Sequence, residues 1–107
     1  MVVDEKIKTK KTGKKRRPIR PEEKEFLHVL GMDIRKRRSE KNFTQEDLSR
    51  YSGVSKISIT NIERGITGTT LKTLMKLASA LDTSAQEMLS IAGNAALEYK
   101  KKEINKA

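Results

Sequence analysis

The sequence predicts an all-α fold in which five short helices follow a basic, disordered N-terminal arm. Apolar residues recur at three- and four-residue spacing in five separate stretches, which is typical of helices with one buried face. Residues that cap or end helices separate these stretches, and no stretch shows the alternation expected of a strand. With 107 residues, the chain has room for one small domain with a modest core.

Residues 1–21 are predicted to form the arm. Nine Lys or Arg residues stand against two acidic ones, so this segment carries +7 of the chain's formal net charge of +10. The segment also holds both prolines, Pro18 and Pro21, and few apolar residues. Because like charges repel and little surface can be buried to offset the entropy of ordering, we expect the arm to be disordered.

The first helix is expected from about Glu22 to Lys41. Pro21 suits a helix start, and acidic residues in the first turn interact favourably with the helix dipole. The spacing of the apolar residues that follow gives this helix one buried stripe, made of Phe26, Leu27, Leu30 and Ile34.

The second and third helices are expected from Gln45 to Ser52 and from Lys56 to Glu63. Thr44, with an acidic residue three positions later, and Ser55 are good N-caps for them. Gly53 makes the turn between the helices, because glycine tolerates the left-handed conformation at a helix end. The inward-facing apolar residues are Leu48, Ile59 and Ile62.

Two further helices complete the predicted domain, after Gly65 stops the third. Thr70 caps the fourth helix, and Ser84 with Glu87 forms a capping box for the fifth. After Gly93 the chain favours helix but becomes increasingly polar, and residues 92–107 are expected to form a C-terminal extension that is either helical or frayed. The apolar stripes are Leu71, Leu74, Met75, Leu77, Ala78 and Leu81 in the fourth helix, and Met88, Leu89 and Ile91 in the fifth.

The segment 44–64 is predicted to be a helix-turn-helix, two short helices joined by a turn with a glycine. Its pattern Thr-Gln-Glu-x-Leu, Gly-Val-Ser and Ile-x-x-Ile-Glu-x-Gly resembles the Cro/CI-type, or XRE-like, family of regulators. The resemblance covers about residues 31–89 and implies a lambda-repressor-like DNA-binding domain over residues 22–91. It also implies a salt bridge between Arg38 and Glu63 that fixes the third helix on the body of the domain.

The third helix is predicted to read bases in the major groove, which an α-helix fits. Lys56 can donate to O6 and N7 of guanine, and Asn61 can pair with N6 and N7 of adenine. Ile57 either contacts a thymine methyl or packs against the second helix. With the residues that the resemblance adds, the predicted DNA-binding set is Gln45, Ser55, Lys56, Ile57, Ser58, Thr60, Asn61 and Arg64.

Other members of this set have subsidiary roles. The resemblance implies that Gln45 braces the third helix and contacts the DNA backbone or a base. The hydroxyls of Ser58 and Thr60 can bond to phosphate or base, although Ser58 is nearly as well explained as a surface residue without a partner. Arg64 is expected at a phosphate, or otherwise as a solvated cation favoured by the helix dipole.

The basic arm is a second candidate for contact with DNA. Its residues Lys14, Lys15, Arg16, Arg17 and Arg20 could follow phosphates, enter a narrow minor groove, or add only non-specific attraction. The loop 65–70 has no Lys or Arg, a departure from many relatives. Backbone amides at the start of the fourth helix, with the hydroxyls of Thr69 and Thr70, are the expected phosphate contacts there.

The predicted function is a sequence-specific regulator that binds double-stranded operator DNA in the cytoplasm, with repression the favoured mode. Relatives usually dimerise on two half-sites, so we expect a homodimer, with residues 92–97 as a candidate interface between the anchors Ile91 and Leu97. The alternative is an antitoxin that binds its operator through the same domain and a toxin partner through segments 1–21 or 92–107.

Other classes of function fit the sequence poorly. With no cysteine and one histidine, His28, it offers no disulfide, no thiolate zinc site and no catalytic constellation, so neither an enzyme nor a cofactor is expected. No apolar run approaches the roughly 20 residues that span a bilayer, and the arm lacks an amphipathic face for a membrane surface. Four aromatic residues give little support for stacking on RNA bases.

Overall fold

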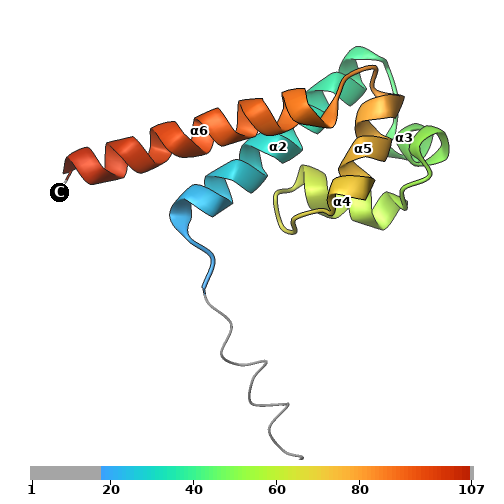
Figure 1. The fold of residues 1–107 in the computed structure, drawn as a ribbon. Helices are drawn as coiled ribbons and strands as arrows, with labels where there is room; N and C mark the ends of the chain where they lie inside the picture. The colour runs from blue at the N-terminus through green and yellow to red at the C-terminus, as the bar shows by residue number, and fades with distance from the viewer. Residues whose placement is uncertain (1–17, 107) are drawn as a thin grey trace, which may run out of the picture.

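The computed structural model describes residues 18–106, and within this range it contains five helices and no strand (Figure 1). The helices are α2 (Pro21–Glu40), α3 (Gln45–Ser52), α4 (Lys56–Glu63), α5 (Leu71–Ala80) and α6 (Ala85–Lys106). The long helices α2 and α6 lie side by side, and α3, α4 and α5 form a compact group at one end of the pair. The all-α prediction is confirmed. The predicted arm residues Lys14, Lys15, Arg16 and Arg17 lie outside the described residues.

Local hydrogen bonds explain why α3 and α4 begin and end where the sequence predicts. The Thr44 hydroxyl accepts from the backbone N–H of Asp47 at 3.0 Å, and the Asp47 carboxylate accepts from that of Thr44 at 2.9 Å. These bonds hold the pKa of Asp47 below its usual value. Gly53 ends α3 with φ +79°, a left-handed conformation that suits glycine, and Ser55 caps α4.

The core draws on all five helices: α2 packs against α4 and α6, α3 packs against α4 and α5, and α5 also contacts α6. Gly31 marks the closest approach of α2 to α4: a Cβ atom there would lie 2.3 Å from the carbonyl oxygen of Ile62. The buried apolar residues are Leu30, Ile34, Leu48, Val54, Ile59, Ile62, Leu74, Leu77, Ala78, Leu81, Met88 and Ala92.

One prediction about the C-terminal half is wrong, the breadth of the buried stripe on α5. Leu71 and Met75 are 61% and 57% exposed, because α5 turns a narrower face to the core than its apolar stripe suggested. The extension, for which the sequence leaves a helical and a frayed form open, is helical as far as Lys106, where α6 ends. The helix passes through Gly93 because α6 packs along α2 on both sides of this residue. A Cβ atom at Gly93 would lie 3.9 Å from the Phe26 ring, an ordinary contact distance, so this position does not require a glycine.

Candidate nucleic-acid interface

A buried ion pair anchors α4 to α2. The Arg38 guanidinium donates to Glu63 twice, from Nε at 2.7 Å and from Nη2 at 3.0 Å, and its Nη1 donates to the carbonyl oxygen of Phe43 at 2.8 Å. The Glu63 side chain is 3% exposed and that of Arg38 is 13% exposed. The bonds to Glu63 raise the pKa of Arg38 above its usual value, against the opposing effect of burial. This arrangement is the one that the family resemblance implied for the pair.

Gln45 extends this pair into a network that joins α3 to α4. Its Nε2 donates to Glu63 at 3.1 Å, and its Oε1 accepts from the Thr60 hydroxyl at 2.8 Å. A carboxylate accepts only, so the amide nitrogen must face Glu63 and the amide oxygen must face the hydroxyl. Both ends of the Gln45 amide are therefore occupied, which fixes α4 against the first turn of α3.

The outer face of α4 carries the residues predicted to read bases. Ile57 is 74% exposed, so it does not pack against α3, and that alternative interpretation is wrong. Lys56 is exposed and Asn61 half-buried, while Ile59 and Ile62 hold the opposite face in the core. The helix thus presents an ammonium group, an amide and an unpaired apolar side chain on one surface.

The first turn of α4 carries two bonded hydroxyls. The Ser55 hydroxyl accepts from the backbone N–H of Ser58 at 3.1 Å and donates to the Ser58 hydroxyl at 2.9 Å. Ser58 therefore has a partner within the protein, contrary to the interpretation that it has none. Each hydroxyl oxygen keeps further hydrogen-bonding capacity toward a ligand.

An acidic residue that sequence reasoning missed lies beside this surface. The Glu46 carboxylate, in the first turn of α3, accepts from the Lys56 ammonium at 2.7 Å, and both side chains are more than half exposed. This bond holds the pKa of Glu46 below its usual value. The two residues are ten positions apart on different helices, so only the angle between α3 and α4 brings them together.

A polar hollow of about 460 Å³ separates α4 from the start of α5, lined by Ser58, Asn61, Ile62, the loop 67–70 and Thr73. Thr70 caps α5 by accepting from the backbone N–H of Thr73 at 3.1 Å.

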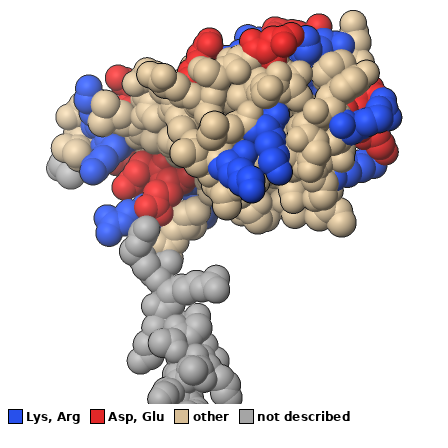
Figure 2. Space-filling model, turned by 45° about the vertical axis from the view of Figure 1, so that its right-hand side comes forward, with Lys and Arg blue, Asp and Glu red and all other residues tan. Residues whose placement is uncertain are grey.

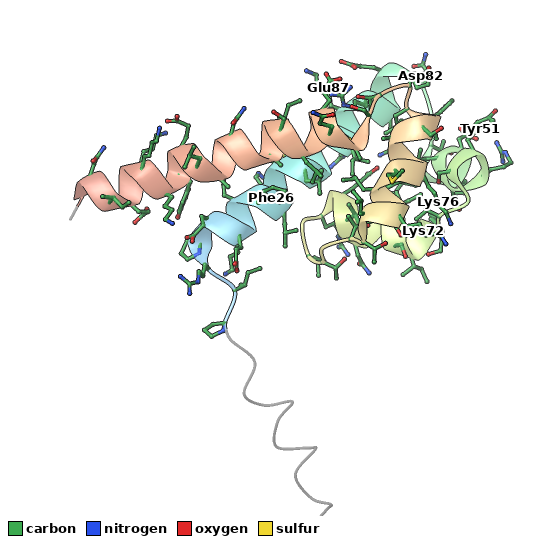
Figure 3. The ribbon with its side chains drawn as sticks, in the orientation of Figure 1. Phe26, Tyr51, Lys72, Lys76, Asp82 and Glu87 are labelled. Atoms are coloured by element: carbon green, nitrogen blue, oxygen red, sulfur yellow. The ribbon has the colours of Figure 1, made fainter. Side chains whose placement is uncertain are left out.

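Beyond this cap, Lys72 and Lys76 lie one turn apart on the exposed side of α5, and Figure 3 shows both between α5 and α3. These cations follow a loop without Lys or Arg, and sequence reasoning missed them. Figure 2 shows basic side chains gathered in the middle of one face, surrounded by uncharged residues.

The remaining predicted cations lie at the ends of helices. Arg64 is the exposed C-cap of α4. Arg20 is the exposed N-cap of α2, and residues 18–20 leave α2 on the lower side of Figure 1, the side on which α4 lies. Pro21 is the first residue of α2 rather than the last residue of the arm.

Two further features bear on the chemistry that is available. The described part of the chain has no cluster of three or more His, Asp or Glu side chains that could hold a metal ion. Within residues 18–106, none of the helices combines the length and the apolar character that crossing a membrane requires.

Comparison with known proteins explains the arrangement. The helix-turn-helix family HTH_3 matches residues 34–88, more than half of the chain. Control protein C.SmaI of Serratia marcescens is 37% identical over 69 residues, which are 64% of this chain and 82% of that protein.

Two solved structures share the fold as well as the sequence. The restriction-modification controller protein C.AhdI of Aeromonas hydrophila is 34% identical with a TM-score of 0.56, over 58% of this chain and 94% of that one. The controller protein C.Esp1396I, solved as a tetramer with its natural 35-base-pair operator, is 30% identical with a TM-score of 0.57, over 67% of this chain and 95% of that one. Family members are regulators rather than enzymes, as predicted. The chain belongs to the HTH_3 family of helix-turn-helix, DNA-binding transcriptional regulators with a lambda-repressor-like fold.

Proposed function

We propose that this regulator binds a specific double-stranded operator with α4 in the major groove and represses transcription from it. The observation that carries the proposal is the 74% exposure of Ile57, an aliphatic side chain that lies outward on a helix whose other face is locked into the core. An apolar group on a base-reading helix has one good partner in the major groove, the C5-methyl group of thymine.

The neighbouring side chains suit the remaining base edges and the phosphates. Lys56 donates to guanine and Asn61 pairs with adenine, while Ser55, Ser58 and Thr60 bond to phosphate or base. Arg64, Lys72 and the start of α5 lie where phosphates of the same duplex pass. Gln45 contributes chiefly by position, because its amide is held by Glu63 and Thr60.

We further propose that the chain acts as a homodimer on two half-sites, since one helix-turn-helix contacts only a few base pairs. C.Esp1396I, solved as a tetramer on its operator, is a relative that assembles on DNA. The candidate segment 92–97 is partly used within the protein, because Ala92 is fully buried. The exposed Leu71 and Met75, which line a shallow apolar hollow of about 430 Å³ with residues 83–86, are the better interface.

Thymine contact by Ile57 has a direct test. Duplexes are selected from a random library with the full chain, and affinities are measured for a selected duplex and a scrambled one. Ile57→Ala is expected to weaken binding to the selected duplex about fivefold, the value of roughly one buried methyl group, and to leave the scrambled duplex unchanged. Ile104→Ala, at an isoleucine 62% exposed near the end of α6, is the matched control.

Replacing thymine by uracil at the contacted position removes the same methyl group from the DNA side. The loss should match that of Ile57→Ala, and the two changes together should cost little more than either one. Equal losses on selected and scrambled duplexes would remove Ile57 from the base-reading residues and overturn the proposed mode of binding.

A second candidate role is control of a restriction-modification operon. It is favoured by C.AhdI and C.Esp1396I, whose names state such control and which this chain matches over most of their lengths. In that case the selected operator would occur upstream of the chain's own gene, beside genes for a nuclease and a methyltransferase. A reporter fused to that promoter distinguishes repression from activation.

A further inference from the structure

A negative charge lies on the surface that the proposed function turns toward DNA. The Glu46 carboxylate reaches the same region as the Lys56 ammonium, because the two groups are 2.7 Å apart. Both are exposed, at 63% and 52%, so the pair stands in solvent rather than in the core. A carboxylate there opposes the approach of phosphates and removes much of the attraction that Lys56 would otherwise exert on any duplex.

The stability of the protein does not account for this pair. An exposed ion pair contributes little to folding, and the α3 start is already held by the capping box of Thr44 and Asp47. The favourable interaction of Glu46 with the α3 dipole requires an acidic residue in the first turn, but it does not require a contact with Lys56. The contact therefore calls for an explanation at the binding surface.

We infer that Glu46 is a positioning residue that determines specificity, by directing Lys56 to guanine and away from phosphate; this rests on the proposed base-reading function of α4. A lysine ammonium has three N–H donors on a flexible stem. When one donor is held by Glu46, two remain, which matches the two acceptors, O6 and N7, that guanine presents. The nearby carboxylate repels a phosphate but not a neutral base edge.

The test compares Glu46→Gln with Glu98→Gln, which removes the same charge from an exposed site in the C-terminal half of α6. The C-terminal half of this helix extends away from α4 (Figure 1). Affinities are measured at several salt concentrations for a duplex selected by the wild-type protein and for its scrambled version. Glu46→Gln should raise affinity for the scrambled duplex about tenfold and leave affinity for the selected duplex nearly unchanged. The dependence of log K on log salt should steepen by about 0.9 for the scrambled duplex, as for one added phosphate contact.

The effect must also depend on Lys56. In a Lys56→Met background, Glu46→Gln should change both duplexes by the same factor, because no ammonium remains to be redirected. Circular dichroism at each step checks that the exposed substitutions leave the helices intact. A structural role for Glu46 would alter both duplexes alike, in either background.

Three results are decisive. A tenfold fall in the ratio of selected to scrambled affinity, seen only with Lys56 present, supports the inference. A ratio that is unchanged in Glu46→Gln, while the wild-type protein discriminates between the duplexes, overturns the role of Glu46 and leaves the proposed function intact. A wild-type protein that does not discriminate at all overturns both.

Discussion

Removal of the Glu63 carboxylate should destabilise the fold more than any change on the DNA-facing surface. This carboxylate accepts three charge-assisted hydrogen bonds, two from Arg38 and one from Gln45, and its side chain is 3% exposed. At about 1.5 kcal/mol for each bond the sum is roughly 4–5 kcal/mol. Breaking a buried pair by removing one partner costs about 3–5 kcal/mol, because the other charge is left uncompensated. We therefore expect Glu63→Ala to lower the free energy of unfolding by about 4 kcal/mol.

Urea unfolding followed by circular dichroism measures this loss. A small domain has only about 5–15 kcal/mol of stability, so Glu63→Ala can leave part of the protein unfolded at room temperature. Glu63→Gln keeps the shape of the side chain and one acceptor oxygen, so it should lower the free energy of unfolding less, by about 2 kcal/mol. Asp82→Asn, which removes an exposed ion pair with Lys41 and keeps a side chain that tolerates the φ of +56° at this position, is the control and should change stability by less than about 1 kcal/mol. A urea midpoint for Glu63→Ala equal to that of the control would refute the reasoning.

Three further predictions concern the close approach of helices, base reading and the arm. Gly31→Ala should lower the free energy of unfolding by about 2–3 kcal/mol, measured in urea, because its Cβ would lie 2.3 Å from a backbone oxygen of α4. Gly93→Ala, whose Cβ would have its nearest contact at 3.9 Å, should raise the free energy of unfolding by about 0.5–1 kcal/mol. Equal effects of the two substitutions would contradict this. Asn61→Ala should cost about 1–3 kcal/mol on the selected duplex and much less on a scrambled one, and an equal loss would show that Asn61 reads no base. Deletion of residues 1–17, which carry a net charge of +6, should leave the helical signal of the domain intact and weaken binding to all duplexes. If four of these cations touch phosphates, the salt dependence should flatten by roughly 3–4 units, and an unchanged slope would direct attention to a protein partner for the arm.

Helix limits could be predicted from the sequence wherever a short-range hydrogen bond determines them. The caps at Thr44, Ser55 and Thr70 each bond to a backbone N–H three residues away, so the cause and its effect lie in one short stretch of sequence. Gly53 likewise acts through its own backbone conformation. The orientation of Ile59 and Ile62 followed from helical spacing, and this placed Lys56 and Asn61 outward.

Features that depend on packing between distant segments could not be predicted in this way. The apolar stripe of α5 is wider than the face that the core accepts, so Leu71 and Met75 are exposed although their spacing matches that of Leu74. The passage of α6 through Gly93 depends on α2, which lies more than fifty residues earlier in the chain. The residues around Gly31 in the sequence give no sign that a glycine is required there, because the requirement comes from a carbonyl oxygen on α4 that a Cβ atom would meet.

The same distinction applies to the binding surface and changes how its residues should be interpreted. Sequence reasoning treated Lys56 as a group with free donors, yet its ammonium is engaged by Glu46. It expected Gln45 to brace the third helix, and the structure shows Gln45 bonded to Glu63 and Thr60. A residue held at both ends, like the Gln45 amide, determines where its neighbours lie, because its nitrogen is bonded to Glu63 and its oxygen to Thr60, and only its second N–H and second lone pair remain for DNA. A residue held at one end, like Lys56, keeps donors for a ligand while losing freedom of orientation. In the proposed mode of binding, specificity depends on α3 as well as on α4, since α3 supplies the acceptor that limits where the Lys56 ammonium can point.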